Sequence, residues 1–141
     1  MKEYKKYYGK CDKHNKNVFY MEIGEGVTSI GSYAFYECSG LISITIPDSV
    51  TSVGQYAFSY TSLKSITIPD SVERIYDYAF STCKNLTKAT IGATTLGQNV
   101  FHNCENLTEV TFTDGTNSIG DYTFNNCTSL ANVTFGNNIT S

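Results

Sequence analysis

Hydrophobic residues recur along the chain with a period of 21 to 23 residues. Each unit is marked by a phenylalanine, at Phe35, Phe58, Phe80, Phe101 and Phe124. Another hydrophobic residue stands five positions before each phenylalanine, and a leucine follows five or six positions after it. A repeat of this length predicts a solenoid, because one unit cannot bury its hydrophobic face alone and neighbouring units must share a core.

The periodicity changes within each unit. Residues 41–46 end in an alternation of hydrophobic and polar positions, and their β-branched side chains favour a strand. Equivalent strands are predicted near 63–68, 86–91, 107–112 and 130–135. Residues 47–49 (Pro-Asp-Ser) end the first of them with a turn, and residues 50–53 alternate again as a short second strand. Residues 56–58 and their equivalents lack alternation, so we expect a tight helical or 3₁₀ turn there.

The repeat also predicts how the chain is organised. Residues 18–29 hold Met21, Ile23 and Val27 in the hydrophobic slots of a second half-unit. Five full units follow, at 30–52, 53–74, 75–95, 96–118 and 119–141. We therefore divide the chain into a basic, lysine-rich N-terminal segment, 1–17, and a solenoid, 18–141.

One unit reads Ala34-Phe35-x-x-Cys38-x-x-Leu41-x-x-Ile44-x-Ile46-Pro47, and five tandem versions of this pattern lie within residues 18–141. The pattern resembles the leucine-rich repeat of the BspA surface-antigen type. The resemblance implies a β-rich leucine-rich-repeat solenoid, a right-handed coil with a parallel sheet on one face and short turns or 3₁₀ segments on the other. It also implies a cell-surface or secreted protein, and some members of the family are adhesins. Because the sequence shows no signal peptide, a cytoplasmic location is the alternative.

Charge is distributed unevenly along the chain. Residues 1–17 carry six lysines against two acidic residues, whereas residues 18–141 carry four basic residues against eleven acidic ones. The acidic solenoid would repel polyanions, so we expect no nucleic-acid partner. The basic segment could touch an acidic surface or remain a solvated terminus. No stretch approaches the ~20 consecutive hydrophobic residues of a membrane span.

Few side chains are candidates for chemistry. Four of the five cysteines occupy one position of the repeat: Cys38, Cys83, Cys104 and Cys127. We expect these four to be buried, reduced thiols rather than disulfides. Cys11 and His14 have a C-x-x-H spacing, but no second pair of ligands accompanies them, so we predict no metal site. With only two histidines the chain offers no catalytic constellation, and we expect neither an enzyme nor a cofactor.

The predicted partner surface is the exposed side of the long strands, where every second side chain points away from the core. The residues assigned to it are Tyr20, Thr45, Thr67, Lys88, Thr90, Glu109, Thr111 and Thr134. We expect a non-enzymatic module that binds a protein or a glycan in protein–protein or cell-surface adhesion. The alternative is a purely structural segment or spacer, which could associate end to end through an uncapped C-terminal coil.

A second column of side chains precedes the core phenylalanines. It consists of Tyr33, Tyr56, Tyr78 and Tyr122, and Asn99 interrupts it. Stacked tyrosines either shield the edge of the coils or bind a peptide or glycan. The sequence leaves both interpretations open.

Overall fold

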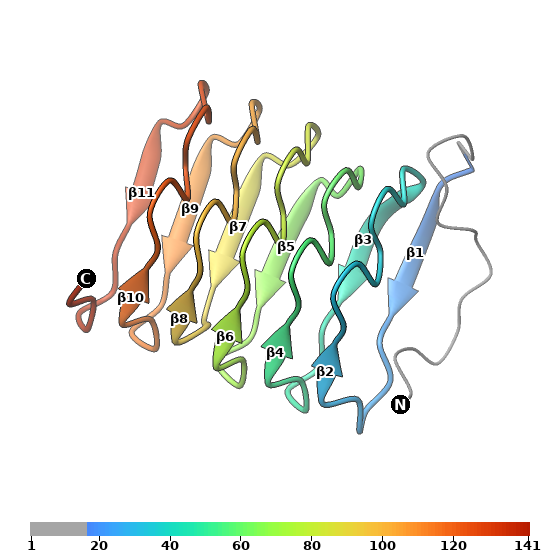
Figure 1. The fold of residues 1–141 in the computed structure, drawn as a ribbon, viewed down its shortest axis with the longest axis horizontal. Helices are drawn as coiled ribbons and strands as arrows, with labels where there is room; N and C mark the ends of the chain where they lie inside the picture. The colour runs from blue at the N-terminus through green and yellow to red at the C-terminus, as the bar shows by residue number, and fades with distance from the viewer. Residues whose placement is uncertain (1–16) are drawn as a thin grey trace.

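The computed structural model describes residues 17–141 as a solenoid of parallel strands, shown in Figure 1. Each coil carries one long strand, and the long strands lie side by side along the solenoid. They are β1 (Phe19–Glu22), β3 (Leu41–Thr45), β5 (Ser65–Ile68), β7 (Lys88–Ile91), β9 (Glu109–Phe112) and β11 (Asn132–Thr134). This arrangement confirms the predicted β-solenoid.

Four of the long strands begin two residues later than the alternation predicts. In three of them the leucine that opens the predicted strand still belongs to the preceding turn. The N–H groups of Leu86, Leu107 and Leu130 each donate to the carbonyl three residues earlier, at 3.1–3.2 Å. Each of these leucines therefore closes a turn, and the ladder begins after it. Leu41 makes the same bond to the Cys38 carbonyl at 3.1 Å and nevertheless opens β3.

A second parallel sheet is built from short strands, drawn in front of the long ones in Figure 1. Its members are β2 (Ser29–Ile30), β4 (Ser52–Val53), β6 (Arg74–Ile75), β8 (Thr95–Leu96) and β10 (Ser118–Ile119). The alternation of residues 50–53 predicts β4, although only its last two residues pair. The long strands and the short strands pair in parallel because every coil repeats the same path and lies next to the preceding coil.

The long strands form two sheets rather than one. β1 pairs with β3, and β5, β7, β9 and β11 form a separate four-stranded sheet. The break falls where the repeat lacks one residue, before Leu63. Backbone hydrogen bonds still cross it, since the N–H of Lys64 donates to the Ile42 carbonyl at 3.3 Å. The two sheets are therefore neighbouring parts of one wall.

The turns that return the chain to the long strands are not helical, so the expectation of a helical or 3₁₀ turn is wrong within residues 17–141. Two residues in each turn, four positions apart, have φ between 56° and 65°. They are Tyr33 and Glu37, Tyr56 and Tyr60, Tyr78 and Thr82, Asn99 and Asn103, and Tyr122 and Asn126.

In this backbone, successive N–H groups of a turn donate alternately to the following coil and to their own coil. The Phe58 N–H donates to Ala79 of the following coil at 2.7 Å, and the Ser59 N–H donates to Tyr56 of its own coil at 3.3 Å. A helix would keep all of these bonds within itself. The left-handed residues thus allow about half of the turn donors to join one coil to the next.

A stack of phenylalanine rings runs through the core. Neighbouring rings among Phe35, Phe58, Phe80, Phe101 and Phe124 have centroids 5.0–5.9 Å apart and planes within 13° of parallel. Phe58 and Phe80 are completely buried, as the repeat predicts. The half-unit contributes to the same core, because Met21, Ile23 and Val27 are buried too.

Residues 17–141 form no helix, and so none that is long and apolar enough to cross a membrane. The C-x-x-H spacing of Cys11 and His14 lies outside the described residues.

Candidate functional site

The predicted partner surface lies on the outer side of the long strands, which we call the strand face. Alternation along each strand creates it: in β7, Lys88 is exposed, Ala89 is buried, Thr90 is half-buried and Ile91 is buried. Of the eight predicted residues, Tyr20, Thr45, Thr67, Lys88, Glu109 and Thr134 are exposed, and Thr90 and Thr111 are half-buried. All eight can therefore be reached from solvent.

The parallel ladders bring most of these residues into one register. Thr67 lies opposite Thr90, Thr90 opposite Thr111, and Thr111 opposite Thr134. Four of the five predicted threonines therefore form one column. Thr45 belongs to the neighbouring two-stranded sheet, where it lies opposite Glu22.

Tyr20 stands apart from the threonine column. It lies on β1, opposite Ser43 of β3, and is 73% exposed. It is the aromatic residue among the eight that the sequence assigned to this surface. The strand face otherwise carries short polar side chains, Glu22 on β1 and the two charged residues of its centre.

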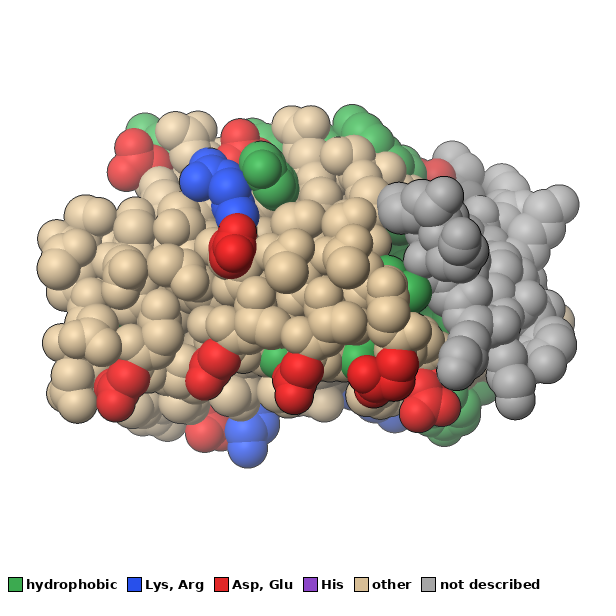
Figure 2. Space-filling model, turned by 90° about the horizontal axis from the view of Figure 1, so that it is seen from below, with side chains coloured by type: hydrophobic (Ala, Val, Ile, Leu, Met, Phe, Trp, Pro, Cys, Tyr) green, Lys and Arg blue, Asp and Glu red, His purple; other side chains and the backbone are tan. Residues whose placement is uncertain are grey.

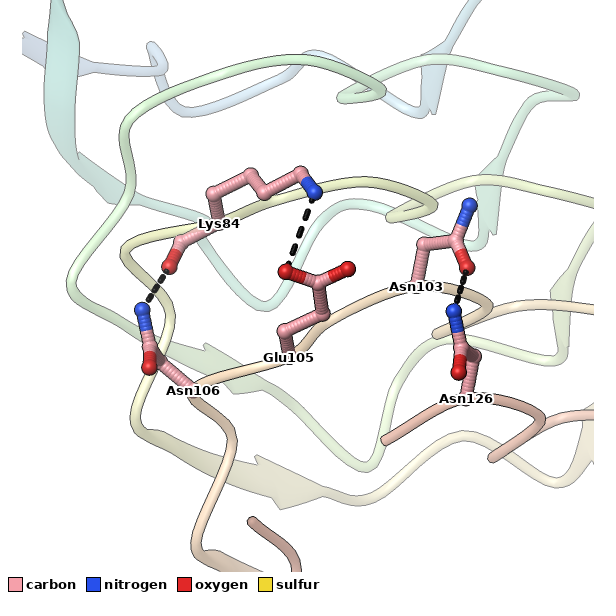
Figure 3. A network of polar contacts seen from close by, with 5 residues as sticks. All are labelled: Lys84, Asn103, Glu105, Asn106 and Asn126. Carbon is pink, nitrogen blue, oxygen red and sulfur yellow. Dashed lines mark hydrogen bonds and ion pairs between the residues drawn. The ribbon is translucent and has the colours of Figure 1, made fainter. Parts of the chain in front are cut away.

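Lys88 and Glu109 are direct neighbours across the ladder. Among the described residues, however, no ion pair within 4 Å joins them. The ion pair that does form links Lys84 Nζ to Glu105 Oε1 at 3.1 Å on the adjacent turn edge, shown in Figure 3. Lys88 and Glu109 thus remain exposed and unpaired with each other.

Asparagine side chains connect coils along the same turn edge (Figure 3). Asn126 Nδ2 donates to Asn103 Oδ1 at 2.7 Å, and Asn106 Nδ2 donates to the Lys84 carbonyl at 2.6 Å. Because these amides are engaged with the neighbouring coil, we assign them a structural role.

The tyrosine column stacks as predicted in its first three members. Tyr33, Tyr56 and Tyr78 have successive centroids 5.1 and 4.9 Å apart. The sequence analysis missed Tyr36 and Tyr60, which join the stack edge-on, with centroids 5.8 Å apart from each other. Partial burial, followed by the charge of Glu37, raises the pKa of Tyr36. Stacking covers the ring faces, so the cluster presents mainly ring edges and hydroxyl groups.

The cysteine column is partly as expected. Cys83, Cys104 and Cys127 are free thiols. Cys83 and Cys104 are buried as predicted, whereas Cys127 is half-buried. Each donates to the carbonyl of the core phenylalanine one coil earlier, at 3.1–3.2 Å. This contact with the preceding coil explains why cysteine suits the position.

Cys38 differs, and the prediction of a reduced thiol there is wrong. It is disulfide-bonded, and its partner lies outside the described residues. The preceding half-unit, 18–29, holds no core phenylalanine whose carbonyl could accept a hydrogen bond from this sulfur. Cys38 thus lacks the backbone acceptor that the equivalent cysteines of the later coils share.

Most charged side chains of the described residues are acidic, eleven against four basic ones. Figure 2 shows Asp and Glu side chains along the lower edge of that view, with few Lys or Arg. Among residues 17–141, no group of three or more His, Cys, Asp or Glu side chains is arranged to hold a metal ion.

Two further residues were missed by the sequence analysis although the repeat signals them. Arg74 stands where equivalent coils have Ser29, Ser52, Thr95 and Ser118, and Tyr76 stands where they have glycine. The Arg74 guanidinium carbon lies over the Tyr76 ring, 5.0 Å from its centroid. Both residues can be recognised in the sequence because they differ from the residues at the same positions of the other coils.

This repeat geometry has counterparts among known proteins. The sequence profile of the BspA type leucine rich repeat region matches residues 9–104 and 94–141, with six copies. The chain belongs to this family. A search of the curated proteins found no match.

Three solved structures are similar to this BspA-type chain. A leucine rich repeat protein of T. pallidum is 30% identical, with a TM-score of 0.77 over 84% of this chain and 59% of that one. A leucine rich cell surface protein of Faecalibacterium prausnitzii A2-165 is 28% identical, with a TM-score of 0.60 over 91% and 44%. A leucine-rich repeat protein of Bacteroides ovatus ATCC 8483 is 29% identical, with a TM-score of 0.54 over 79% and 35%. The chain thus spans between 35% and 59% of the lengths of these relatives.

Proposed function

We propose that this chain is a non-enzymatic binding module that contacts a protein partner through the strand face, in adhesion or another cell-surface interaction. The observation that carries the proposal is the register of β5, β7, β9 and β11, which sets outward polar side chains in one unbroken array. Similarity to a leucine rich cell surface protein supports the adhesive role.

The size of the strand face indicates its affinity. Strands ~4.8 Å apart and residues ~3.3 Å apart give six strands of four residues a surface of roughly 380 Å². A stable complex buries about 800 Å² on each partner. One copy of the strand face should therefore bind with modest affinity, and useful strength would come from many coils or many chains.

Charge reversal at the centre of the strand face tests this proposal. We expect the labelled protein to bind at least one of three immobilised matrix proteins, fibronectin, laminin and collagen, in a biolayer interferometry assay. The double variant Lys88→Glu/Glu109→Lys should weaken that binding by about tenfold, because both charges lie centrally on the contact surface. Its melting temperature should shift by less than about 2 °C, since both side chains are exposed.

The matched control is Lys84→Glu/Glu105→Lys, the same exchange of charges on the turn edge, which should leave binding unchanged. If binding survives the strand-face exchange but is lost when residues 1–17 are removed, the basic segment is the binding element and the solenoid is a scaffold. If none of the three matrix proteins binds, the structural alternative, a solenoid segment or spacer, is favoured.

A further inference from the structure

The short-strand sheet carries a local departure from the repeat that the fold does not require. Four coils have glycine directly after the short strand: Gly31, Gly54, Gly97 and Gly120. Coils approach closely here, because a Cβ added at Gly54 would overlap the Ser32 backbone and one added at Gly120 would overlap the Gly97 carbonyl. Tyr76 nevertheless occupies this column in the third full coil. Its N–H donates to Val53 at 2.9 Å, as the Gly54 N–H donates to Ile30 at 2.8 Å.

Arg74 holds the Tyr76 ring in place. Its guanidinium lies over the ring at 5.0 Å from the centroid, a cation–π contact that fixes the orientation of an otherwise free side chain. Tyr76 remains 44% exposed. The third coil therefore presents a pre-oriented aromatic ring on a sheet whose neighbouring coils have no side chain at that position.

Hollows lie on both sides of this Arg74–Tyr76 pair. The first, of about 370 Å³, is lined by Tyr76 and Asp77 together with Ser52, Gln55, Ser29 and Ser32 of the two preceding coils. The second, of about 570 Å³, lies toward the following coils, and Arg74 and Asp77 contribute to its lining while Tyr76 does not. Because Arg74 borders one hollow and Tyr76 the other, we infer that the ring turns the side opposite the guanidinium to the first hollow.

The lining of the first hollow is rich in groups that both donate and accept hydrogen bonds. Serine hydroxyls and the Gln55 amide do both, and a carboxylate accepts two or more. Asp77 Oδ1 accepts the Gln98 N–H at 2.8 Å. Within residues 17–141 its second carboxylate oxygen has no hydrogen-bond partner. Asp77 lines both hollows, so this oxygen can accept a hydrogen bond from a ligand in either of them.

We propose that the first hollow binds one sugar residue of a neutral glycan. The apolar C–H face of the pyranose stacks on Tyr76, and its hydroxyls bond to Asp77, Gln55 and the serines. The carboxylate of Asp77 disfavours a phosphate or another anion. Tyr76 is the exposed large hydrophobic residue of the lining, so the hollow offers one aromatic ring rather than a deep apolar pocket for a peptide side chain. This site lies on the short-strand sheet, so it is separate from the strand face and does not depend on its function.

The experiment uses an array of immobilised neutral oligosaccharides with terminal glucose, galactose, mannose or N-acetylglucosamine, followed by calorimetric titration of the strongest binder in free form. Tyr76→Gly restores the residue of the other four coils and should therefore fold. We expect it to weaken binding at least about tenfold. Asp77→Asn keeps an oxygen that can accept the Gln98 N–H and removes the charge, and should weaken binding about fivefold. Tyr122→Ala, which removes a tyrosine 68% exposed on the turn side, is the matched control and should bind as the unaltered chain does.

Two results would overturn the proposal. One is that the unaltered chain binds no oligosaccharide on the array. The other is that Tyr76→Gly binds the sugar as well as the unaltered chain. If Lys88→Glu abolishes sugar binding while Tyr76→Gly does not, the glycan site lies on the strand face and the assignment to the hollow is wrong. Loss of matrix-protein binding in Lys88→Glu with sugar binding intact would support two separate surfaces.

Discussion

Individual phenylalanines link each coil to its neighbours. Phe80 is completely buried between the rings of Phe58 and Phe101, with centroid distances of 5.0 and 5.4 Å. Stacked rings contribute beyond the area they bury. A phenylalanine in the middle of the stack therefore stabilises three coils at once.

Truncation of this ring should be costly. We expect Phe80→Ala to lower the free energy of unfolding by roughly 3–5 kcal/mol, measured by urea denaturation, through loss of buried area and creation of a cavity. Because coupling in a solenoid runs between neighbours, the variant should also separate unfolding into two transitions. The control is Phe135→Ala, since Phe135 is 56% exposed and its loss should cost much less. Equal effects of the two substitutions would contradict the core described here.

Thiols provide a second measurement at the residue scale. Burial raises the pKa of the Cys127 thiol to about 11. The contact with Cys83, and then burial, raises the pKa of the Cys104 thiol as well. At pH 8 a thiol of pKa ~11 is about 0.1% thiolate, roughly two hundred times less than an ordinary cysteine, and only the thiolate reacts.

We therefore expect Ellman's reagent to label Cys104 and Cys127 of the native protein very slowly at pH 8. Cys83 should also react slowly, because its side chain is completely buried. After unfolding without a reductant, Cys83, Cys104 and Cys127 should react, and Cys38 should react only after reduction. The raised pKa of Cys127 also fixes the sign of a pH effect. As pH rises from the ordinary thiol pKa toward about 11, the unfolded chain loses this proton first, so stability declines. Rapid labelling of the native protein would show that the thiols are not buried.

The turns are the element in which sequence and backbone conflict most. Thr82 has a φ of 56°, although β-branched residues are rare in the left-handed region. Equivalent positions in the two following coils hold Asn103 and Asn126, with φ of 62° and 65°. Asparagine tolerates this conformation, and these two amides are hydrogen-bonded to each other.

Thr82→Asn should therefore stabilise the solenoid by about 0.5–1 kcal/mol, by removing backbone strain and extending the asparagine column by one coil. Chemical denaturation measures this gain. Thr128→Asn is a suitable comparison, because Thr128 is an exposed turn residue without positive φ and should gain nothing. A Thr82→Asn variant less stable than the unaltered chain would contradict the assigned turn geometry.

The elements differ in how far the sequence predicts them. The long strands and the buried phenylalanines follow from hydrophobic periodicity, since every coil must place the same residues in the same core. The left-handed turns could not be predicted in this way, because seven of the ten left-handed positions hold tyrosine, glutamate or threonine instead of the glycine or asparagine that would signal them. The disulfide at Cys38 could not be predicted from the repeat either. A repeat predicts only the features that all coils share, and the equivalent cysteines of the other coils are free thiols.

At the scale of the whole molecule, the sequence also predicts the surface features that all coils share better than those of single coils. The outward residues of the strand face could be listed from alternation alone, but their grouping could not. The division of the long strands into two sheets separates Thr45 from the other four threonines. Arg74 and Tyr76 could have been found from the sequence by asking where one coil departs from the rest.

The hydrogen bonds that join coils also determine how the molecule responds to mechanical load. In both sheets and in the turns they run from one coil to the next, along the length of the solenoid. Tension applied between the ends falls on the outermost row of bonds first, so coils peel away one at a time rather than shearing together. Each coil of about 22 residues can release roughly 75 Å of extended chain. A solenoid with this architecture would yield to a pulling force in small steps and keep its remaining coils folded.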